Sequence, residues 1–136
     1  MTDKRADLLA LAERVEAGSG KDRNLDADIF QRLGGPDWER ALIRVAEPCG
    51  CPEDQAIDYA RSRHSPDYTV SLDAAVALLG RVLPGWSWQA GATVGAGAVA
   101  RIAQDGLRRS DGVASSPARA LLAATLRALA QKEQTT

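Results

Sequence analysis

The side chains best suited to chemistry are two cysteines and the single histidine of the chain. Cys49 and Cys51 are separated only by a glycine, and His64 follows later in the sequence. A zinc site needs four protein ligands, or three and a water, and its cysteine pairs are usually two to four residues apart. One intervening residue and one histidine fall short of that set, so we expect no metal and no other cofactor. A small enzyme or metal site at Cys49, Cys51 and His64 is kept as one alternative.

A cysteine and a histidine could also form a nucleophile and its base. Such a pair needs a third group that orients the base and a pocket for the oxyanion, and the sequence locates neither. We therefore predict no catalytic residues and no enzymatic activity. Two cysteines separated by one residue form a disulfide only with strain. We expect small reduced thiols in a turn between helices, as in a cytoplasmic protein.

A glycine-rich stretch, Gly95-Ala96-Gly97-Ala98-Val99-Ala100, superficially matches a dinucleotide-binding motif. That motif lies between a strand and a helix of a βαβ unit, and an acidic residue follows it about 20 positions later. Here the glycines fall inside or before a predicted strand. They are more typical of a hairpin turn or a bulge.

Aromatic and basic residues in the second half of the chain could form a binding surface. Trp86 and Trp88 lie two positions apart in a predicted strand, so both rings should point to one face. If helices cover that face, the rings belong to the core; if it is open, they form an aromatic platform beside arginines. Aromatic and guanidinium groups suit nucleotides, single strands and protein hot spots. The predicted partner-binding residues are Trp86, Trp88, Arg101, Arg108 and Arg109.

The stretch 36–64 offers a different function, because it resembles a helix-turn-helix. Residues 48–52 would form the turn, and apolar positions recur inside the second helix. That helix opens with Glu53 and Asp54, which repel phosphate, whereas recognition helices commonly read bases with their N-terminal residues. The second alternative is therefore a DNA-binding regulator that uses Arg61, Arg63 and His64.

The spacing of apolar residues predicts six helices and two strands. Each predicted helix is bounded by residues that favour helix ends, such as Ser, Asp, Pro and Gly. The helices are expected to begin after Thr2 or Asp3, after Asp22 or Asn24, at Pro36, at Pro52, after Ser71 and after Ser116. Alternation predicts strands at 86–90 and 94–104. The polar stretch from Asp105 to Ser115 is expected to be a loop suited to partner contact.

Length and composition predict one α+β domain, with helices packed on a small antiparallel β-sheet in a helix-rich, α-β-α sandwich-like arrangement. The 136 residues fit a single domain over residues 1–131, followed by a disordered tail at 132–136. Aromatic residues make up only 4%, and alanine and leucine supply most of the apolar mass, which favours helices. No stretch approaches the ~18 apolar residues of a membrane span, and the charged start does not resemble a signal peptide. We therefore expect a cytoplasmic protein with no membrane partner.

The charges are nearly balanced over the whole chain but not along it. The net charge of -1 indicates neither a polyanion binder nor a DNA mimic. Residues 1–70 hold ten Lys or Arg against fourteen Asp or Glu, a sum of -4, and residues 71–136 hold seven against four, a sum of +3. This asymmetry could orient a partner, although a solvated surface of mixed charge explains it more simply.

Three segments, taken together, resemble the phage ABA sandwich domain family. The first runs from Leu8 to Gly34, the second from Tyr68 to Trp86, and the third from Ser116 to Ala124. Their order, and a Thr-x-Ser-Leu-Asp-Ala-Ala stretch followed by Pro-Gly-Trp, carry the resemblance, which covers about two-fifths of the chain. The stretch 36–66 has no counterpart in the family pattern. The resemblance implies a phage or prophage protein of unknown activity with helices around a small β-sheet, and it transfers no catalytic residue.

The function favoured by these observations is that of a non-catalytic phage or prophage accessory binding protein. Small phage proteins of this kind commonly cover the surface of a host protein or sequester a host molecule, and the roles include anti-CRISPR and other counter-defence activities. A host or phage protein is the expected partner, in the cytoplasm of the bacterial host, and nucleic acid is the alternative partner. The sequence leaves the oligomeric state open.

Overall fold

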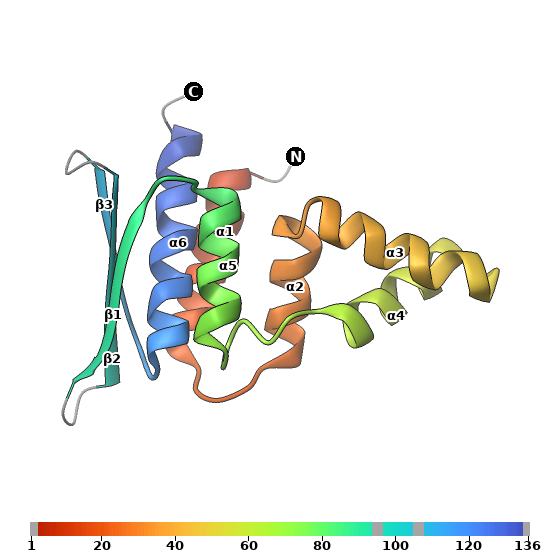
Figure 1. Ribbon diagram of the computed structural model, residues 1–136, viewed down its shortest axis with the longest axis horizontal. Helices are drawn as coiled ribbons and strands as arrows, with labels where there is room; N and C mark the ends of the chain where they lie inside the picture. Colours follow the sequence, from red (N-terminus) through yellow and green to blue (C-terminus); the bar gives the residue numbers. More distant parts are fainter. Residues whose placement is uncertain (1–2, 94–96, 105–107, 135–136) are drawn as a thin grey trace. The chain divides into compact units, whose positions relative to one another are not determined.

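Six helices and three strands follow one another in the part of the chain that the computed structural model describes, residues 3–93, 97–104 and 108–134. The side chains of Cys49, Thr93, Glu133 and Gln134 lie outside this description. The elements are α1 (Lys4–Ala17), α2 (Arg23–Leu33), α3 (Pro36–Cys49), α4 (Glu53–His64), α5 (Leu72–Val82), β1 (Ser87–Thr93), β2 (Gly97–Gln104), β3 (Arg108–Ala114) and α6 (Pro117–Gln134) (Figure 1). The predicted α+β, helix-rich fold is confirmed. No helix in this described part has the length and apolar character that crossing a membrane requires.

Polar side chains cap the first turns of α1, α2 and α5, which begin directly after the predicted residues. The Asp3 carboxylate accepts a hydrogen bond from the Arg5 N–H, and the Ser71 hydroxyl accepts one from the Ala74 N–H. Asp22 caps α2 in the same way. Each bond satisfies a backbone N–H that has no partner within its own helix.

Contacts divide the chain into two compact units. The first comprises Met1–Lys21 and Tyr68–Thr136, and the second comprises Asp22–Asp67. Along the sequence the second unit lies between α1 and α5, and it contains the whole stretch 36–66. The predicted single domain over residues 1–131 stays a prediction, and within it the contacts form these two units.

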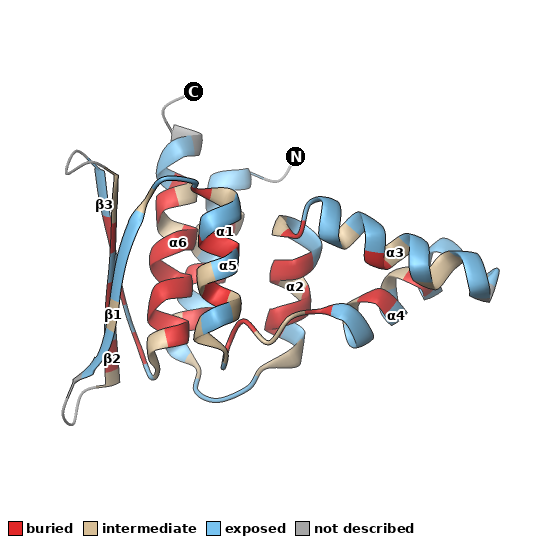
Figure 2. Ribbon diagram, viewed as in Figure 1, coloured by how far each residue is buried: buried red, intermediate tan, exposed pale blue. Residues whose placement is uncertain are grey.

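In the first unit α6 is the central element. It packs against α1, α5 and all three strands. Every residue from Ala118 to Leu126 is buried, so this helix is surrounded over more than two turns (Figure 2). Its leucines fill the core, and its alanines let neighbouring backbones approach closely. Because α6 extends to Gln134, the first residues of the predicted tail 132–136 are helical, and residues 135–136 lie outside the described part.

The strands form one antiparallel sheet in the order β1-β2-β3. In this unit α6 lies against one face of the sheet, and the other face is exposed (Figure 1). The predicted strand 94–104 is observed as β2 from Gly97 onward, and residues 94–96 lie outside the described part. Gly97 has a positive φ of 83°. A glycine in that conformation at the start of a strand agrees with the predicted turn rather than with a nucleotide-binding motif.

The prediction of a loop from Asp105 to Ser115 is wrong, because Arg108–Ala114 forms β3; residues 105–107 lie outside the described part. Buried and exposed residues alternate along β3, and its buried positions are Ser110, Gly112 and Ala114. These side chains are small or absent, so the strand lacks the β-branched pattern from which strands are recognised. An Asp-Gly pair within it is also a common turn signal.

Close packing of α6 explains the small residues of β3. A Cβ atom on Gly112 would overlap the carbonyl oxygen of Ala120 and would lie 2.9 Å from the backbone nitrogen of Ala124. The strand and the helix therefore meet backbone to backbone. The absent side chain is a packing requirement here, not a turn signal.

The second unit consists of α2, α3 and α4, and α3 and α4 run side by side (Figure 1). Gly50 follows α3 in a left-handed conformation (φ 62°), which a glycine adopts without strain. Arg61 on α4 pairs with Asp28 on α2 (Nη2 to Oδ1, 2.7 Å) and donates to the Gln31 side chain. A helix, a turn and a second helix are thus present over the stretch 36–64.

Candidate functional site

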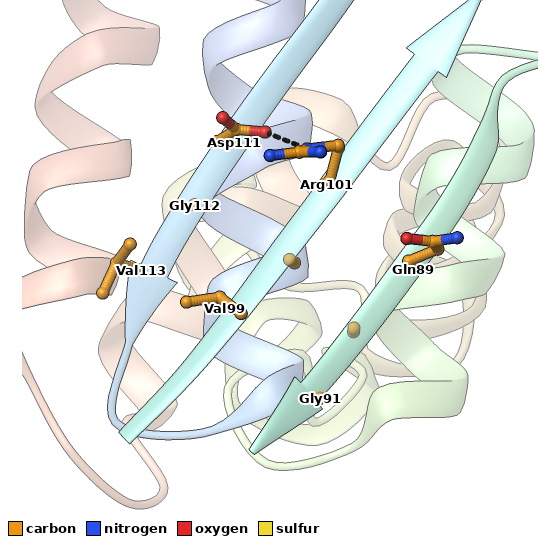
Figure 3. Close-up of a pocket in the computed structure, with 9 residues that line it drawn as sticks. Gln89, Gly91, Val99, Arg101, Asp111, Gly112 and Val113 are labelled. Atoms are coloured by element: carbon orange, nitrogen blue, oxygen red, sulfur yellow. Dashed lines mark hydrogen bonds and ion pairs between the residues drawn. The ribbon is translucent and has the colours of Figure 1, made fainter. Parts of the chain in front are cut away.

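The open face of the sheet in the first unit is the candidate functional site. Residues directly opposite one another on antiparallel strands point to the same face. The register therefore places side chains of three strands in rows across the sheet. The polar row is Gln89, Arg101 and Asp111, and the row beside it is Gly91, Val99 and Val113. The side chains of both rows project to one side of the sheet, away from the helices (Figure 3).

An ion pair crosses the polar row. Arg101 Nε donates to Asp111 Oδ1 over 3.1 Å, and Arg109 Nη2 lies 3.8 Å from Asp111 Oδ2. The three side chains are between 48% and 60% exposed. Pairs this exposed contribute little to stability. One carboxylate between two guanidinium groups leaves several N–H donors available for another molecule.

A hollow of about 480 Å³ lies over this face. Gly91 has no side chain, so the surface is hollowed at its position in the apolar row. Val99 and Val113 in the same row are 45% and 56% exposed. Ala100 and Gly112 also line the hollow. Two adjacent exposed valines next to paired charges offer both apolar and polar contacts, which is the mixture that protein-binding surfaces present.

The outer edge of β3 is closed by side chains from α1 and α6. The Val113 N–H donates to Glu16 Oε2 over 3.0 Å. Arg127 donates to both Glu16 oxygens and, over 3.3 Å, to the carbonyl oxygen of Asp111. Burial raises the pKa of Glu16, but the hydrogen bonds from Arg127 and Val113, together with the Arg127 charge, outweigh burial and hold that pKa below its ordinary value of 4.5. Glu16 is therefore ionised at neutral pH and fixes one border of the open face.

The lowered pKa of Glu16 predicts a pH-dependent loss of stability. A carboxyl group with a depressed pKa in the folded state stabilises fully above its unfolded pKa, and this contribution disappears as the pH falls through the folded pKa. Wild type should therefore exceed Glu16→Gln in free energy of unfolding by a constant amount near neutral pH, and the difference should shrink below about pH 4.5. Urea denaturation over a pH series measures this. Glu13→Gln, which removes an exposed carboxylate of the same helix, is the matched control, and a Glu16→Gln difference that is equal at every pH would contradict the prediction.

Known proteins supply no guide to this face. Comparisons with protein-family models, curated proteins and solved structures found no match. The resemblance to the phage family therefore stays a prediction, and the face is interpreted from its own geometry. Among the described residues, no three His, Cys, Asp or Glu side chains are grouped so that they could hold one metal ion.

The predicted contact residues do not share one face. Arg101 and Arg109 lie on the open face. Trp88 is paired with a buried residue of β2 and so points to the helix side, where it is 40% exposed, and Trp86 precedes β1 and packs half-buried against the core. Arg108 is adjacent to Arg109 and points the opposite way. The predicted platform of tryptophans beside arginines is therefore wrong, because strand alternation separates the two groups.

The residues of the DNA-binding alternative have separate surroundings. Arg61 is held by its aspartate partner on α2. The Arg63 guanidinium carbon lies 5.0 Å from the centre of the Tyr59 ring. His64 lines a hollow of about 300 Å³ together with two arginine side chains of α3. Both arginines thus already contact neighbours within the second unit, and DNA binding stays a prediction.

Cys51 and His64, two residues of the enzyme or metal alternative, do not come together. Cys51 is disulfide-bonded, so the expectation of a reduced thiol is wrong there; the Cys49 side chain lies outside the described part. The left-handed Gly50 turns the chain sharply between the two cysteine positions. Cys51 and His64 lie at opposite ends of α4, whose 12 residues span about 18 Å. The argument from reduced thiols for a cytoplasmic location no longer applies.

Four residues of the open face were missed in the sequence, namely Gln89, Val99, Asp111 and Val113. The usable signal was the alternation of β3, where exposed and small buried residues follow one another. Small and polar residues are also typical of a loop, so this alternation is difficult to recognise from the sequence of β3 alone. Once β3 is recognised, pairing with β2 places Asp111 beside Arg101.

Proposed function

We propose that this protein is a non-catalytic binding protein that holds a partner protein against the open face of its sheet. The observation that carries the proposal is the exposed pair Val99 and Val113, which lie directly opposite each other on β2 and β3. Single exposed valines are common on protein surfaces. Two that adjoin, beside a hollow of about 480 Å³, form a contiguous apolar spot that a partner can cover.

The charges on this face define the chemistry of the partner. Asp111 is shared between Arg101 in the same row and Arg109 two positions earlier on β3, so these three side chains together carry one more positive than negative charge. The guanidinium groups retain donors that suit carboxylates. The proposed partner is therefore a protein with an acidic, partly apolar surface, such that its apolar side chains cover the valines and its carboxylates reach the arginines.

A phage or prophage context completes the proposal. It is supported by the resemblance of the three segments described above, and the proposed partner is a host or phage protein. The protein would act by occupying the surface that its partner needs for another contact, as counter-defence proteins do. The geometry of the face suits this mode, because surface coverage requires complementarity and no reacting group.

Substitutions on the two faces of the sheet test the proposal. A photo-crosslinking residue at position 113 identifies the partner, and its affinity for purified variants is then measured. Val99→Glu and Val113→Glu should each weaken binding about tenfold or more, because each removes an apolar contact and adds a charge that repels an acidic partner. Val70→Glu is the matched control, since Val70 is 48% exposed but lies outside the sheet.

A second pair of variants separates charge from position. Arg109→Ala should weaken the complex, whereas Arg108→Ala, adjacent in sequence but pointing the other way, should not. Melting temperatures of all variants should match that of wild type, because every substituted side chain is exposed. If the glutamate variants at Val99 and Val113 bind as tightly as the Val70 control, the open face is not the contact surface.

A further inference from the structure

The two outer edges of the sheet differ in how their backbone groups are satisfied. At the outer edge of β3, the N–H of Val113 and the carbonyl of Asp111 are bonded to Glu16 and Arg127. Side chains thus close that edge against further strands. β1 forms the other edge of the sheet (Figure 3).

The backbone direction of β1 follows from the same two bonds. In antiparallel strands the N–H and C=O of one residue point to the same side, and successive residues alternate. The backbone N–H and C=O groups of Asp111 and Val113 point away from β2. The backbone groups of their partners on β2, Arg101 and Val99, therefore point toward β1. The β1 residues opposite these two therefore bond to β2. It follows that Trp88, Ala90 and Ala92 direct their N–H and C=O groups away from the sheet.

The edge formed by β1 lacks, among the described residues, the side-chain bonds that close the edge of β3. Exposed edge strands are usually protected by Lys or other charges, by Pro, or by a bulge, because unpaired backbone groups attract another strand. The sequence of β1, Ser87-Trp88-Gln89-Ala90-Gly91-Ala92-Thr93, contains no charged residue and no proline, and its pairing with β2 runs without interruption. Among the described residues, no hydrogen bond to the outward groups of Trp88, Ala90 or Ala92 occurs outside the sheet. The edge is therefore ready to accept a strand.

We propose that β1 pairs with β1 of a second copy of this chain, antiparallel and centred on Ala90, to form a six-stranded sheet. In this register large residues face small ones across the twofold axis. Trp88 lies opposite Ala92 of the second copy, Gln89 lies opposite Gly91, and Ala90 lies opposite itself. The pattern is self-complementary along the strand, which a symmetric interface requires. The three outward-pointing residues of each copy would exchange hydrogen bonds across the axis.

The surroundings of Trp88 also favour a second copy of the chain at this edge. Its ring points to the helix side of the sheet but remains 40% exposed, because β1 lies at the border of the helical layer. Leu72, Val76, Val82 and Trp86, which pack against the core of the same unit, are also only partly buried. A second copy would continue both the sheet and the apolar layer, and it would cover the exposed part of the Trp88 ring. The open face with Val99 and Val113 would remain available, so the dimer presents two such faces.

Sedimentation of the full chain over a range of concentrations tests the dimer. Wild type should associate reversibly to a dimer. Ala90→Pro removes the central N–H and should raise the dimer dissociation constant about 10- to 100-fold, since the two central bonds are lost. The fold should persist, because Pro is tolerated on an edge strand where the N–H faces outward. Ala90→Gly keeps the N–H and is the matched control, so it should still dimerise.

Amide exchange of wild-type protein provides a test that needs no variant. The N–H groups of Trp88, Ala90 and Ala92 should become protected as the concentration rises, whereas those of Gln89 and Gly91 should be protected at every concentration. A chain that stays monomeric up to about 1 mM, the weak end of measurable association, overturns the proposal. So does a dimer in which Ala90→Pro changes nothing. Because these measurements use only the pure protein, they are independent of the partner proposed for the open face.

Discussion

Replacing Arg119 by alanine is expected to lower the free energy of unfolding by about 3–5 kcal/mol, because the substitution removes three hydrogen bonds from a charged donor and leaves the carbonyl of the buried Val15 without this donor. Arg119 is 1% exposed and belongs to α6. Its Nη1 donates to the Val15 carbonyl over 2.9 Å, and its Nε and Nη2 donate to the Gly20 carbonyl over 3.2 and 2.8 Å. The Val15 carbonyl lies in the last turn of α1, where carbonyls have no partner within the helix and a cation is favoured. One guanidinium group thus fastens the end of α1 to the central helix.

Two further substitutions isolate the cause. Arg119→Lys keeps the charge, but lysine has no planar fork of donors that reaches both carbonyls. The free energy of unfolding of this variant should therefore lie between those of wild type and Arg119→Ala. Arg108→Ala removes an exposed arginine and should change stability by no more than about 0.5 kcal/mol. Urea denaturation of the three variants and wild type gives the order of their free energies of unfolding. A loss below about 1 kcal/mol in Arg119→Ala would show that water replaces the side chain without difficulty.

The helices of this fold are predictable from sequence because their ends are set by neighbouring residues. Asp3, Asp22 and Ser71 each bond to a backbone N–H two or three positions away, and Gly18 follows directly after α1. Such interactions need no knowledge of the rest of the chain. The helix-rich fold could therefore be predicted from local sequence alone.

Strand β3 could not be recognised in the same way, because its residue types are selected by a distant helix. Gly112 is small since α6 crosses it, and Ser110 is polar yet buried since its hydroxyl donates to the Ala124 carbonyl over 2.8 Å. Read locally, the same residues indicate a loop. The role of Arg119 is equally hidden, since its acceptors Val15 and Gly20 precede it by about a hundred positions.

The candidate site depends on register, which explains why its prediction failed in part. Arg101 and Arg109 were identified from their type, and they do lie on the open face. Trp88 is predicted on the same surface. The residue of β1 opposite Arg101 is Gln89, however, and Trp88 is its direct neighbour, so the Trp88 side chain points to the other face. Side chains group on a sheet by the parity of their positions as well as by their chemistry. The open face becomes visible only when all three strands are aligned.

Replacing Gly112 by alanine is expected to destabilise the first unit by about 3 kcal/mol, the upper end of ordinary overpacking. The added Cβ would meet backbone atoms of Ala120 and Ala124, and backbone cannot move aside as the end of a flexible side chain can. The sheet and α6 would have to separate, and α6 packs against every other element of this unit. Thermal and urea denaturation measure the loss.

Gly91→Ala is the matched control, because it places the same substitution in the same sheet. A Cβ atom on Gly91 meets nothing within 4 Å. Alanine restricts the unfolded chain more than glycine does, so this variant should be as stable as wild type or about 0.5 kcal/mol more stable. The opposite signs expected for two identical substitutions separate close backbone packing from strand propensity, since propensity alone predicts the same sign for both. Equal stability changes in the two variants would mean that α6 does not approach β3 as closely as the structure places it.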